Sequence, residues 1–159
     1  LSALGNLDWV LSLGDESDHG AVIAAALERP PSPLLYLPYL RGERSPFTDP
    51  HARAAFIGLA AHHRRADLQR AVLEGIAFAY KHALEALASA APERVAVTGG
   101  GTRSPGFCQL LADVLGIPVI IPENASHVGL KGALMAAQMS RGDLDSFRPR
   151  LEAAQAFDP

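Results

Sequence analysis

Two short apolar runs, each followed by a helical pattern, constrain the fold more than any other feature of this sequence. Val95–Val97 precedes a glycine-rich stretch and an apolar helix face. Val119–Ile121, placed between two prolines, precedes a second helical segment that runs to about Arg141. The order strand, helix, strand, helix implies parallel strands joined by right-handed crossovers. The pattern therefore predicts an α/β domain.

The helix of the first unit has clear signals at both ends. Ser104 is a good N-cap, Pro105 suits the first helical position, and Gly116 suits a left-handed C-terminus. The residues between them recur at the spacing of one buried helix face: Phe107, Leu110, Leu111, Val114 and Leu115. We therefore expect a helix over 105–115.

A longer helix is predicted over 67–88, where apolar residues recur every three or four positions. This buried stripe consists of Leu68, Val72, Ile76, Ala79, Ala83 and Leu87. Gly75 lies inside the helix at a cost of about 1 kcal/mol relative to alanine, so we expect a close neighbour there. Two pairs of opposite charges, each one helical turn apart, are expected on exposed faces: Arg70–Glu74 and Lys81–Glu85.

Shorter elements precede this helix. Helices are predicted over 1–13 and from about Asp18 to the prolines at 30 and 31. The run 34–37 suits a buried strand, 55–59 is a second candidate strand, and a polar loop over 41–53 separates them.

The loop between the first strand and its helix is the candidate ligand site. Parallel strands bring such loops to one edge of a sheet, where ligands bind. Gly99, Gly100 and Gly101 carry no Cβ, so a ligand can lie against their backbone, and the helix N-terminus behind them favours a phosphate. The alternative is a plain tight turn. Ser104 either caps the helix or donates its hydroxyl to the ligand.

The glycine loop matches neither of two common nucleotide motifs. No Gly-Lys-Ser/Thr follows it, which excludes a Walker A loop, and the third glycine position of a dinucleotide fingerprint is Ser104. The last helix adds a small-residue face that suits either sheet packing, which we favour, or a flat ligand ring: Gly129, Gly132, Ala133, Ala136 and Ala137.

Composition limits the classes of partner. The net charge is −3 with acids and bases interspersed, so a nucleic-acid partner has no electrostatic support. The apolar runs are far shorter than the ~20 residues that a membrane span needs. Cys108 is the only cysteine, which indicates a reducing compartment and favours the cytoplasm.

The chain starts at Leu1 inside an apolar segment, so we expect a fragment of a longer protein.

Two groups of polar residues have competing interpretations. His51 and the adjacent pair His62–His63 suggest either a metal site or surface polarity, and we favour the surface. Arg41, Glu43 and Arg44 either reach a nucleotide or sugar, or hold their own loop in place, and we favour the structural role.

Several motifs resemble those of the FGGY carbohydrate kinases, the xylulokinase branch especially. Residues 37–46, LPYLRGERSP, resemble the family's LPYLxGERTP segment, and residues 54–74 fit its carboxyl-terminal signature. Residues 99–104, GGGTRS, resemble the family's GGGARS adenosine motif, and Gly132-Ala133 resembles its closing GAA stretch. The resemblance runs from about Ser2 to Arg141.

The resemblance implies an actin-like, ribonuclease-H-like α/β fold with a mixed sheet and flanking helices. Residues 1–159 would be a fragment of the carboxyl-terminal, nucleotide-binding domain, with the amino-terminal sugar-binding and catalytic domain upstream of Leu1. Gly99, Gly100, Gly101 and Ser104 match the loop that contacts the nucleotide in the family. Neither a catalytic residue nor a metal ligand is expected in this chain.

The implied reaction is transfer of the γ-phosphoryl group of ATP to a pentulose-like sugar, such as D-xylulose, with Mg²⁺ held mainly by the phosphates and the absent domain. We therefore expect the isolated fragment to be inactive. An exposed sheet edge would favour self-association into a homo-oligomer.

Two other functions compete with the kinase. The first is a non-catalytic actin-like assembly or regulatory domain, which would not need the glycine loop. The second is a nucleotide-dependent acyl-CoA activator on the same fold, which the LPYLRGERSP segment disfavours.

Overall fold

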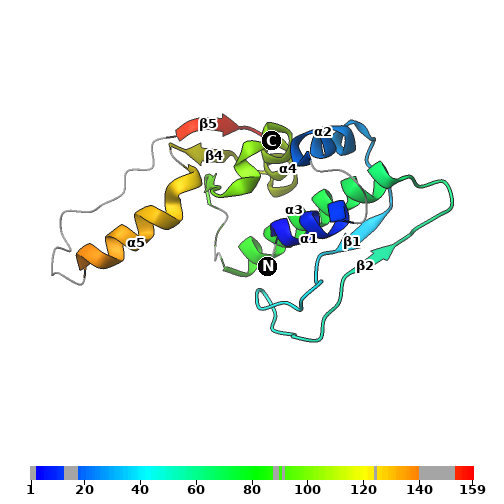
Figure 1. Cartoon of the computed structure of the whole chain (residues 1–159), viewed down its shortest axis with the longest axis horizontal. Helices are drawn as coiled ribbons and strands as arrows, with labels where there is room; N and C mark the ends of the chain where they lie inside the picture. The colour runs from blue at the N-terminus through cyan, green and yellow to red at the C-terminus, as the bar shows by residue number, and fades with distance from the viewer. Residues whose placement is uncertain (1–2, 13–17, 88–89, 91, 124, 140–152) are drawn as a thin grey trace.

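The computed structural model describes residues 3–12, 18–87, 90, 92–123, 125–139 and 153–159 (Figure 1). Its helices are α1 (Ala3–Ser12), α2 (His19–Glu28), α3 (Arg65–Leu87), α4 (Pro105–Leu115) and α5 (Val128–Met139). Its strands are β1 (Leu35–Leu37), β2 (Ala55–Ile57), β3 (Val95–Ala96), β4 (Val119–Pro122) and β5 (Ala153–Phe157). Two short 3-10 turns, η1 (Gly100–Arg103) and η2 (Ala125–His127), precede α4 and α5.

The described strands form two small sheets. β3 and β4 pair in parallel, with Val95 opposite Val119, as the alternation of strands and helices predicted. β5 pairs antiparallel with the other side of β4, which makes a mixed three-stranded sheet in the order β3-β4-β5. β1 and β2 form a separate antiparallel pair. β5 was not predicted, because its segment Ala-Ala-Gln-Ala-Phe has no β-branched residue.

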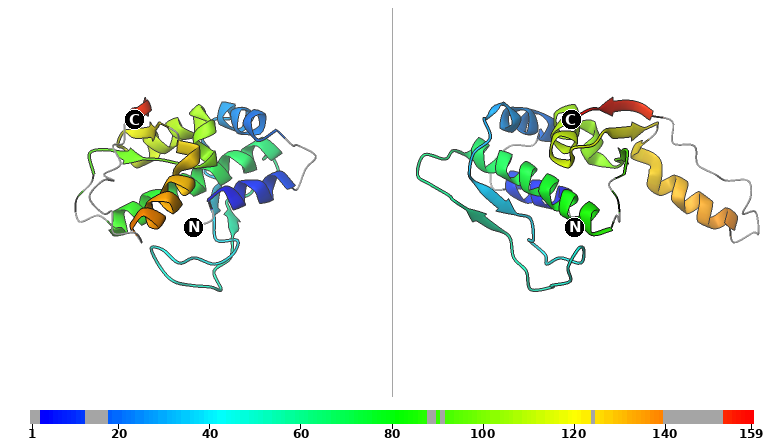
Figure 2. Two further views of the ribbon diagram at one scale, coloured as in Figure 1. Left: turned by 60° about the vertical axis from the view of Figure 1, so that its left-hand side comes forward. Right: turned by 180° about the vertical axis from the view of Figure 1, so that it is seen from behind.

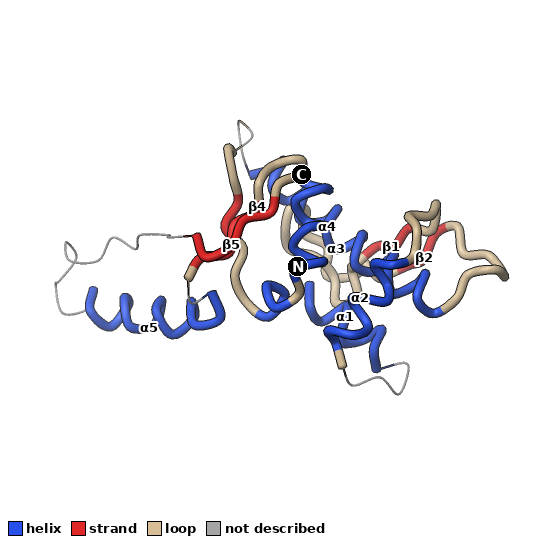
Figure 3. Tube along the Cα trace, turned by 90° about the horizontal axis from the view of Figure 1, so that it is seen from above, coloured by secondary structure: helices blue, strands red, loops and turns tan. Residues whose placement is uncertain are grey.

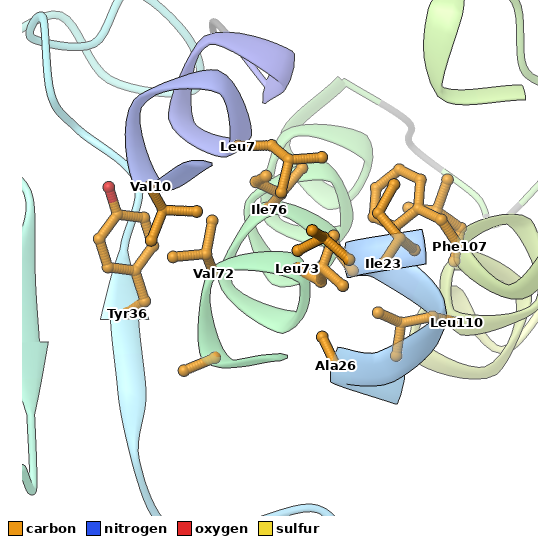
Figure 4. Close-up of a cluster of buried hydrophobic side chains, with 14 of the residues drawn as sticks. Leu7, Val10, Ile23, Ala26, Tyr36, Val72, Leu73, Ile76, Phe107 and Leu110 are labelled. Carbon is orange, nitrogen blue, oxygen red and sulfur yellow. The ribbon is translucent and has the colours of Figure 1, made fainter. Parts of the chain in front are cut away.

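The core lies around α3, which packs against α1, α2, α4 and β1. Figure 4 shows apolar side chains from these elements meeting in one cluster: Leu7, Val10, Ile23, Ala26, Tyr36, Val72, Leu73, Ile76, Phe107 and Leu110. Val72, Leu73 and Ile76 of α3 have at most 1% of their surface exposed. The middle of the periodic stripe on α3, around Val72 and Ile76, therefore lies at the centre of the folded chain.

The glycine in the middle of α3 has the close neighbour that we expected. A Cβ on Gly75 would overlap the carbonyl oxygen of Tyr36 and lie 3.2 Å from the Cβ of Tyr36. β1 therefore crosses α3 at the one position where the helix has no side chain. Asn6, which is 1% exposed, ties α1 to the same place: its amide donates to the Pro38 carbonyl over 3.1 Å and accepts from the Tyr36 hydroxyl over 2.8 Å.

Long side chains of α3 reach the C-terminal ends of two neighbouring helices. The Arg70 guanidinium donates to the carbonyl oxygens of Leu27 and Arg29, where α2 ends. The Lys81 ammonium, for which we predicted a pair with Glu85, donates to the Val114 carbonyl of α4 over 2.9 Å. Both cations lie where the helix dipole is negative.

Three burial predictions were wrong. β1 is not a buried strand: Tyr36 points inward, but Leu35 and Leu37 are 49% and 37% exposed, because the described residues leave the outer face of the β1–β2 pair open. Leu87 is 79% exposed, since the last turn of α3 extends past the core. The Arg70–Glu74 pair forms as predicted, with 2.7 Å between Nε and Oε1, but it is mostly buried rather than exposed.

α5 extends away from the α1–α4 core in Figure 1, in the right-hand view of Figure 2 and in Figure 3. Among the described helices, none combines the length and apolar character needed to cross a membrane.

Candidate functional site

The glycine loop between β3 and α4 is a closed turn. Gly99 has φ 96° and ψ −169°, a conformation essentially restricted to glycine. Its N–H donates to the Ala125 carbonyl of η2 over 3.3 Å. Its carbonyl accepts both the N–H of Thr102, over 3.2 Å, and the Thr102 hydroxyl, over 2.7 Å. Hydrogen bonds therefore hold both the N–H and the carbonyl of Gly99 in place.

Ser104 caps α4, as predicted. Its hydroxyl oxygen accepts the N–H of Phe107 over 3.3 Å, and Pro105 occupies the first helical turn. This contact uses an oxygen lone pair, so the hydroxyl hydrogen can still be donated. Gly116 ends the helix at φ 71°, also as predicted. Local signals thus place the start of α4 behind the glycine loop.

The loop opens onto an outer cavity of about 600 Å³. Gly100, Gly101, Arg103 and Ser104 form one wall. α1 and the start of α2 form the opposite wall, through Leu7, Asp8, Asp18, His19, Gly20 and Ile23. The glycine loop is therefore neither occluded nor turned away from a cavity.

A smaller inner cavity of about 100 Å³ lies on the core side of the loop. Gly99, Gly100 and Gly101 line it together with apolar residues of the core, among them Leu73, Ile76, Val97 and Phe107. Gly100 and Gly101 line both cavities, so this short turn lies between them. A Cβ added to Gly99 would meet no atom within 4 Å.

The two carboxylates that line the outer cavity already have partners. The Asp8 carboxylate of α1 pairs with His19 of α2, with 3.2 Å between Oδ1 and Nε2. Asp18 caps α2 by accepting the N–H groups of Gly20 and Ala21 over 2.9 and 3.1 Å. Arg103 lies exposed on the loop side. The cavity thus has apolar residues, polar groups and exposed backbone in its walls.

The sequence analysis missed the α1–α2 wall. Asp18 was identified only as the start of a helix, and Asp8 and His19 belong to no motif that we recognised. No local pattern marks them, because they reach the glycine loop only when both helices pack on α3.

Burial affects two ionisable groups near the loop. Desolvation raises the pKa of the Tyr80 hydroxyl, which lines the inner cavity. Burial likewise raises the pKa of the Cys108 thiol, whose Sγ lies 3.9 Å from the Gly101 carbonyl oxygen. Cys108 is fully buried and acts as a small apolar residue, as predicted.

The other polar candidates lie away from these cavities. Glu43 is 4% exposed, and its carboxylate accepts the N–H groups of Arg44 and Ser45 over 2.7 and 3.3 Å. Burial tends to raise the Glu43 pKa, but these hydrogen bonds bring it below its usual value. The structural role that we favoured for this residue is confirmed, while Arg41 and Arg44 are exposed and line neither cavity.

The histidines of the turn before α3 make local contacts. His63 Nδ1 accepts the N–H of Ala60 over 2.9 Å, and the rings of His62 and His63 lie 4.2 Å apart. Within the described residues, no group of three or more His, Cys, Asp or Glu side chains is arranged to hold a metal ion.

Among the described residues, the small-residue face of α5 does not pack as we predicted: a Cβ on Gly129 or Gly132 would meet none of their atoms within 4 Å. The reason is the direction of α5, which leads away from the described sheet and the helical core.

Comparisons with known proteins identify the family. Residues 1–141 match the model described as the FGGY family of carbohydrate kinases, C-terminal domain. The xylulose kinase of Escherichia coli (strain K12) is 41% identical over 120 residues, which are 73% of this chain and 25% of that protein. The probable L-xylulose kinase of Pasteurella multocida (strain Pm70) is 34% identical over 150 residues, which are 92% of this chain and 30% of that protein.

Solved structures agree on the fold. The ligand-bound xylulose kinase from Lactobacillus acidophilus superposes with a TM-score of 0.80 at 27% identity, over 97% of this chain and 33% of that one. The Plasmodium falciparum glycerol kinase with ADP has a TM-score of 0.76 over 99% of this chain and 33% of that one. At 18% identity, the second likeness shows the fold alone.

The chain spans about a quarter to a third of the length of these relatives. The expected actin-like α/β fold, here part of the carboxyl-terminal domain, is confirmed. On the match of residues 1–141, the chain belongs to the FGGY family of carbohydrate kinases.

Proposed function

We propose that this chain supplies the nucleotide-binding wall of an ATP-dependent sugar kinase. Gly99, Gly100, Gly101 and Ser104 lie against the nucleotide in this proposal. The observation that carries it is the outer cavity beside the glycine loop, because about 600 Å³ is within the usual range for small-molecule sites.

The walls of this cavity suit an adenine nucleotide in three respects. Leu7 and Ile23 offer apolar surface for a base. Gly100 and Gly101 offer backbone with no side chain in the way. Arg103 and the N-terminal end of α4 add positive charge, which favours a phosphorylated ligand.

We propose a pentulose-like sugar, such as D-xylulose, as the phosphoryl acceptor of the full-length protein, by analogy with the xylulose kinases among the relatives. ATP supplies the phosphoryl group in this reaction. Transfer needs metal-bound phosphates, an in-line acceptor hydroxyl and a group that takes its proton. We place the base, the sugar contacts and the protein ligands of Mg²⁺ outside this chain.

The charged residues of the outer cavity support this division. Asp18 is engaged as a helix cap and Asp8 as an ion-pair partner. We therefore expect no sugar phosphorylation by the 159-residue chain alone. Sugar-dependent ADP release by the purified chain, measured in a coupled assay, would contradict this expectation.

We also propose that the chain forms a homo-oligomer in the cytoplasm. The N–H groups of Val95 and Val97 donate to carbonyls beside β4, so the backbone of Ala96 faces the other edge of the sheet. In the described sheet order that edge is open, and open edges favour pairing. The single thiol supports a reducing compartment. A monomer at every concentration in sedimentation velocity would contradict self-association.

Calorimetric titration with ADP tests the proposed site. We expect ADP to bind the chain, and Gly100→Ala to weaken binding at least about 10-fold, which corresponds to about 1.4 kcal/mol. Gly116→Ala is the control, because it also replaces a glycine but at the opposite end of α4. A chain that does not bind ADP, or a Gly100→Ala variant that binds equally well, would favour the assembly-domain alternative.

A further inference from the structure

Thr102 makes a contact that none of the site residues named so far makes. It lies in η1, directly after the three glycines, and is half-buried. Its hydroxyl and its N–H both donate to the carbonyl of Gly99, over 2.7 and 3.2 Å. A single residue therefore closes the turn twice, once through its backbone and once through its side chain.

The carbonyl that receives these two bonds belongs to Gly99, the glycine of this loop with a positive φ. Its φ of 96° and ψ of −169° lie in a region that glycine enters freely and other residues rarely adopt. Its N–H is held by Ala125 at 3.3 Å. Thr102 holds the opposite side of the same residue, so the two contacts together orient the Gly99 peptide groups.

The turn closed by Thr102 contains Gly100 and Gly101 at its centre. These two residues line both the outer and the inner cavity. Glycine has more accessible backbone conformations than any other residue, so a turn with two central glycines loses much entropy when a ligand orders it. A clamp that orders the turn before binding lowers that cost.

We propose that Thr102 is a positioning residue for nucleotide binding. The hydrogen bond from its hydroxyl to the Gly99 carbonyl holds the Gly100–Gly101 turn in the conformation that the nucleotide contacts. This inference rests on the proposed function. Thr102 lies where the GGGARS motif has alanine, so that motif lacks the side-chain half of the clamp. The backbone half remains in Thr102→Ala and Thr102→Ser, because the N–H of residue 102 donates to the same oxygen.

The test compares ADP affinity in four proteins by calorimetry: the unchanged chain, Thr102→Ala, Thr102→Ser and Thr48→Ala. Losing the hydroxyl bond in Thr102→Ala should weaken ADP binding about 2- to 10-fold. Thr102→Ser keeps the hydroxyl and should restore the affinity. Thr48→Ala is the matched control, because its hydroxyl also donates to a backbone carbonyl, that of Arg44 over 3.4 Å, but lines neither cavity.

Thermal unfolding of the same four proteins separates positioning from a structural role. Weaker binding by Thr102→Ala with rescue by Thr102→Ser supports the inference. A lower Tm with unchanged ADP affinity, or a failure of Thr102→Ser to restore affinity, overturns it. If the unchanged chain does not bind ADP, the proposed function fails and the inference with it. If the chain binds ADP and Thr102→Ala binds it equally well, the inference alone fails.

Discussion

Two regions of this chain require glycine for opposite reasons. Where β1 crosses α3, Gly75 is buried and a Cβ there would overlap the carbonyl oxygen of Tyr36. In the loop after β3, Gly99 has open space around the Cβ position but a backbone conformation that L-residues rarely adopt. The first glycine is required by packing, and the second by its own dihedral angles.

This difference separates a region that supports stability from one that leaves room for a ligand. Around Gly75, Val72 and Leu73 are almost fully buried, so α3 and β1 cannot move apart without disturbing a close-packed core. Around Gly99, cavities of about 600 and 100 Å³ adjoin the loop. We therefore expect substitutions near Gly75 to affect folding, and substitutions near Gly99 to affect ligand binding as well as stability.

The largest effect is expected at the β1–α3 contact. Gly75→Ala forces a methyl group against the backbone of β1, and such overpacking typically costs about 1–3 kcal/mol, which exceeds the gain of up to about 1 kcal/mol in helix propensity. We expect a lower urea midpoint. Gly129→Ala on α5, where the Cβ meets no atom within 4 Å, is the control and should be neutral or stabilising. A Gly75→Ala variant as stable as the unchanged chain would contradict the claim that packing against β1 requires glycine at this position.

A second effect is expected where α1 meets β1. Asn6→Ala leaves the Tyr36 hydroxyl and the Pro38 carbonyl without their amide partner, and we expect a loss of about 1–3 kcal/mol in free energy of unfolding. Combining it with Tyr36→Phe should cost less than the sum of the single changes, because the two side chains share one bond. Strict additivity in urea unfolding would contradict the proposed coupling.

Tyr36 also adds a pH dependence to this region. Burial raises its pKa from 10.0 to about 12. The pKa of Tyr36 in the folded chain lies above its value in the unfolded chain. The contribution of the neutral hydroxyl to the free energy of unfolding is therefore complete below pH 10 and is lost as the pH rises toward 12. Tyr36→Phe should remove that alkaline loss.

Two positive-φ glycines, one directly before η1 and one at the C-terminal end of α4, sharpen the comparison further. Gly99 and Gly116 both have positive φ, 96° and 71°, and open space at the Cβ position. Gly116→Ala should cost about 1–2 kcal/mol of stability through backbone strain, and Gly99→Ala about 1–3 kcal/mol. Only Gly99→Ala should also weaken ADP binding in calorimetry. Equal ADP affinity in both variants would show that the loop conformation does not matter for the ligand.

The smallest effect is expected at the start of α3. The pKa of Asp67 is lowered, chiefly by the hydrogen bond from Arg29 Nε, 2.7 Å long, and also by the N–H of Arg64. A lowered folded pKa means stability that is present above the unfolded value of about 3.9 and is lost as the pH falls through the folded pKa. Asp67→Asn should therefore lower Tm at neutral pH, with the difference vanishing in acid. A difference in Tm between the two proteins that stays the same from neutral to acid pH would contradict the role assigned to the Asp67 carboxylate.

Local signals predicted much of the fold. The cap at Ser104, the proline at 105 and the left-handed Gly116 predicted α4 with its observed bounds. The prediction of parallel β3 and β4 and the packed Gly75 were also confirmed. Each of these rests on interactions within one element or on the order of neighbouring elements, which a single sequence displays.

The errors have a common cause in contacts between distant segments. β5 exists because β4 offers it an edge, not because its own residues favour a strand. Leu35 belongs to a short apolar run and Leu87 to the periodic stripe of α3, yet the described structure leaves both exposed. The small-residue face on α5 was expected to pack, but the helix leads away from the sheet.

By itself, the sequence determined the strand–loop–helix unit, its glycine loop and the family motifs, because backbone preference and capping act over a few neighbouring residues. Only the tertiary structure decided that Asp8 and His19 face that loop across a cavity. About 80 residues or more separate them from Gly100 along the chain, and only the packing of α1 and α2 on α3 brings them together.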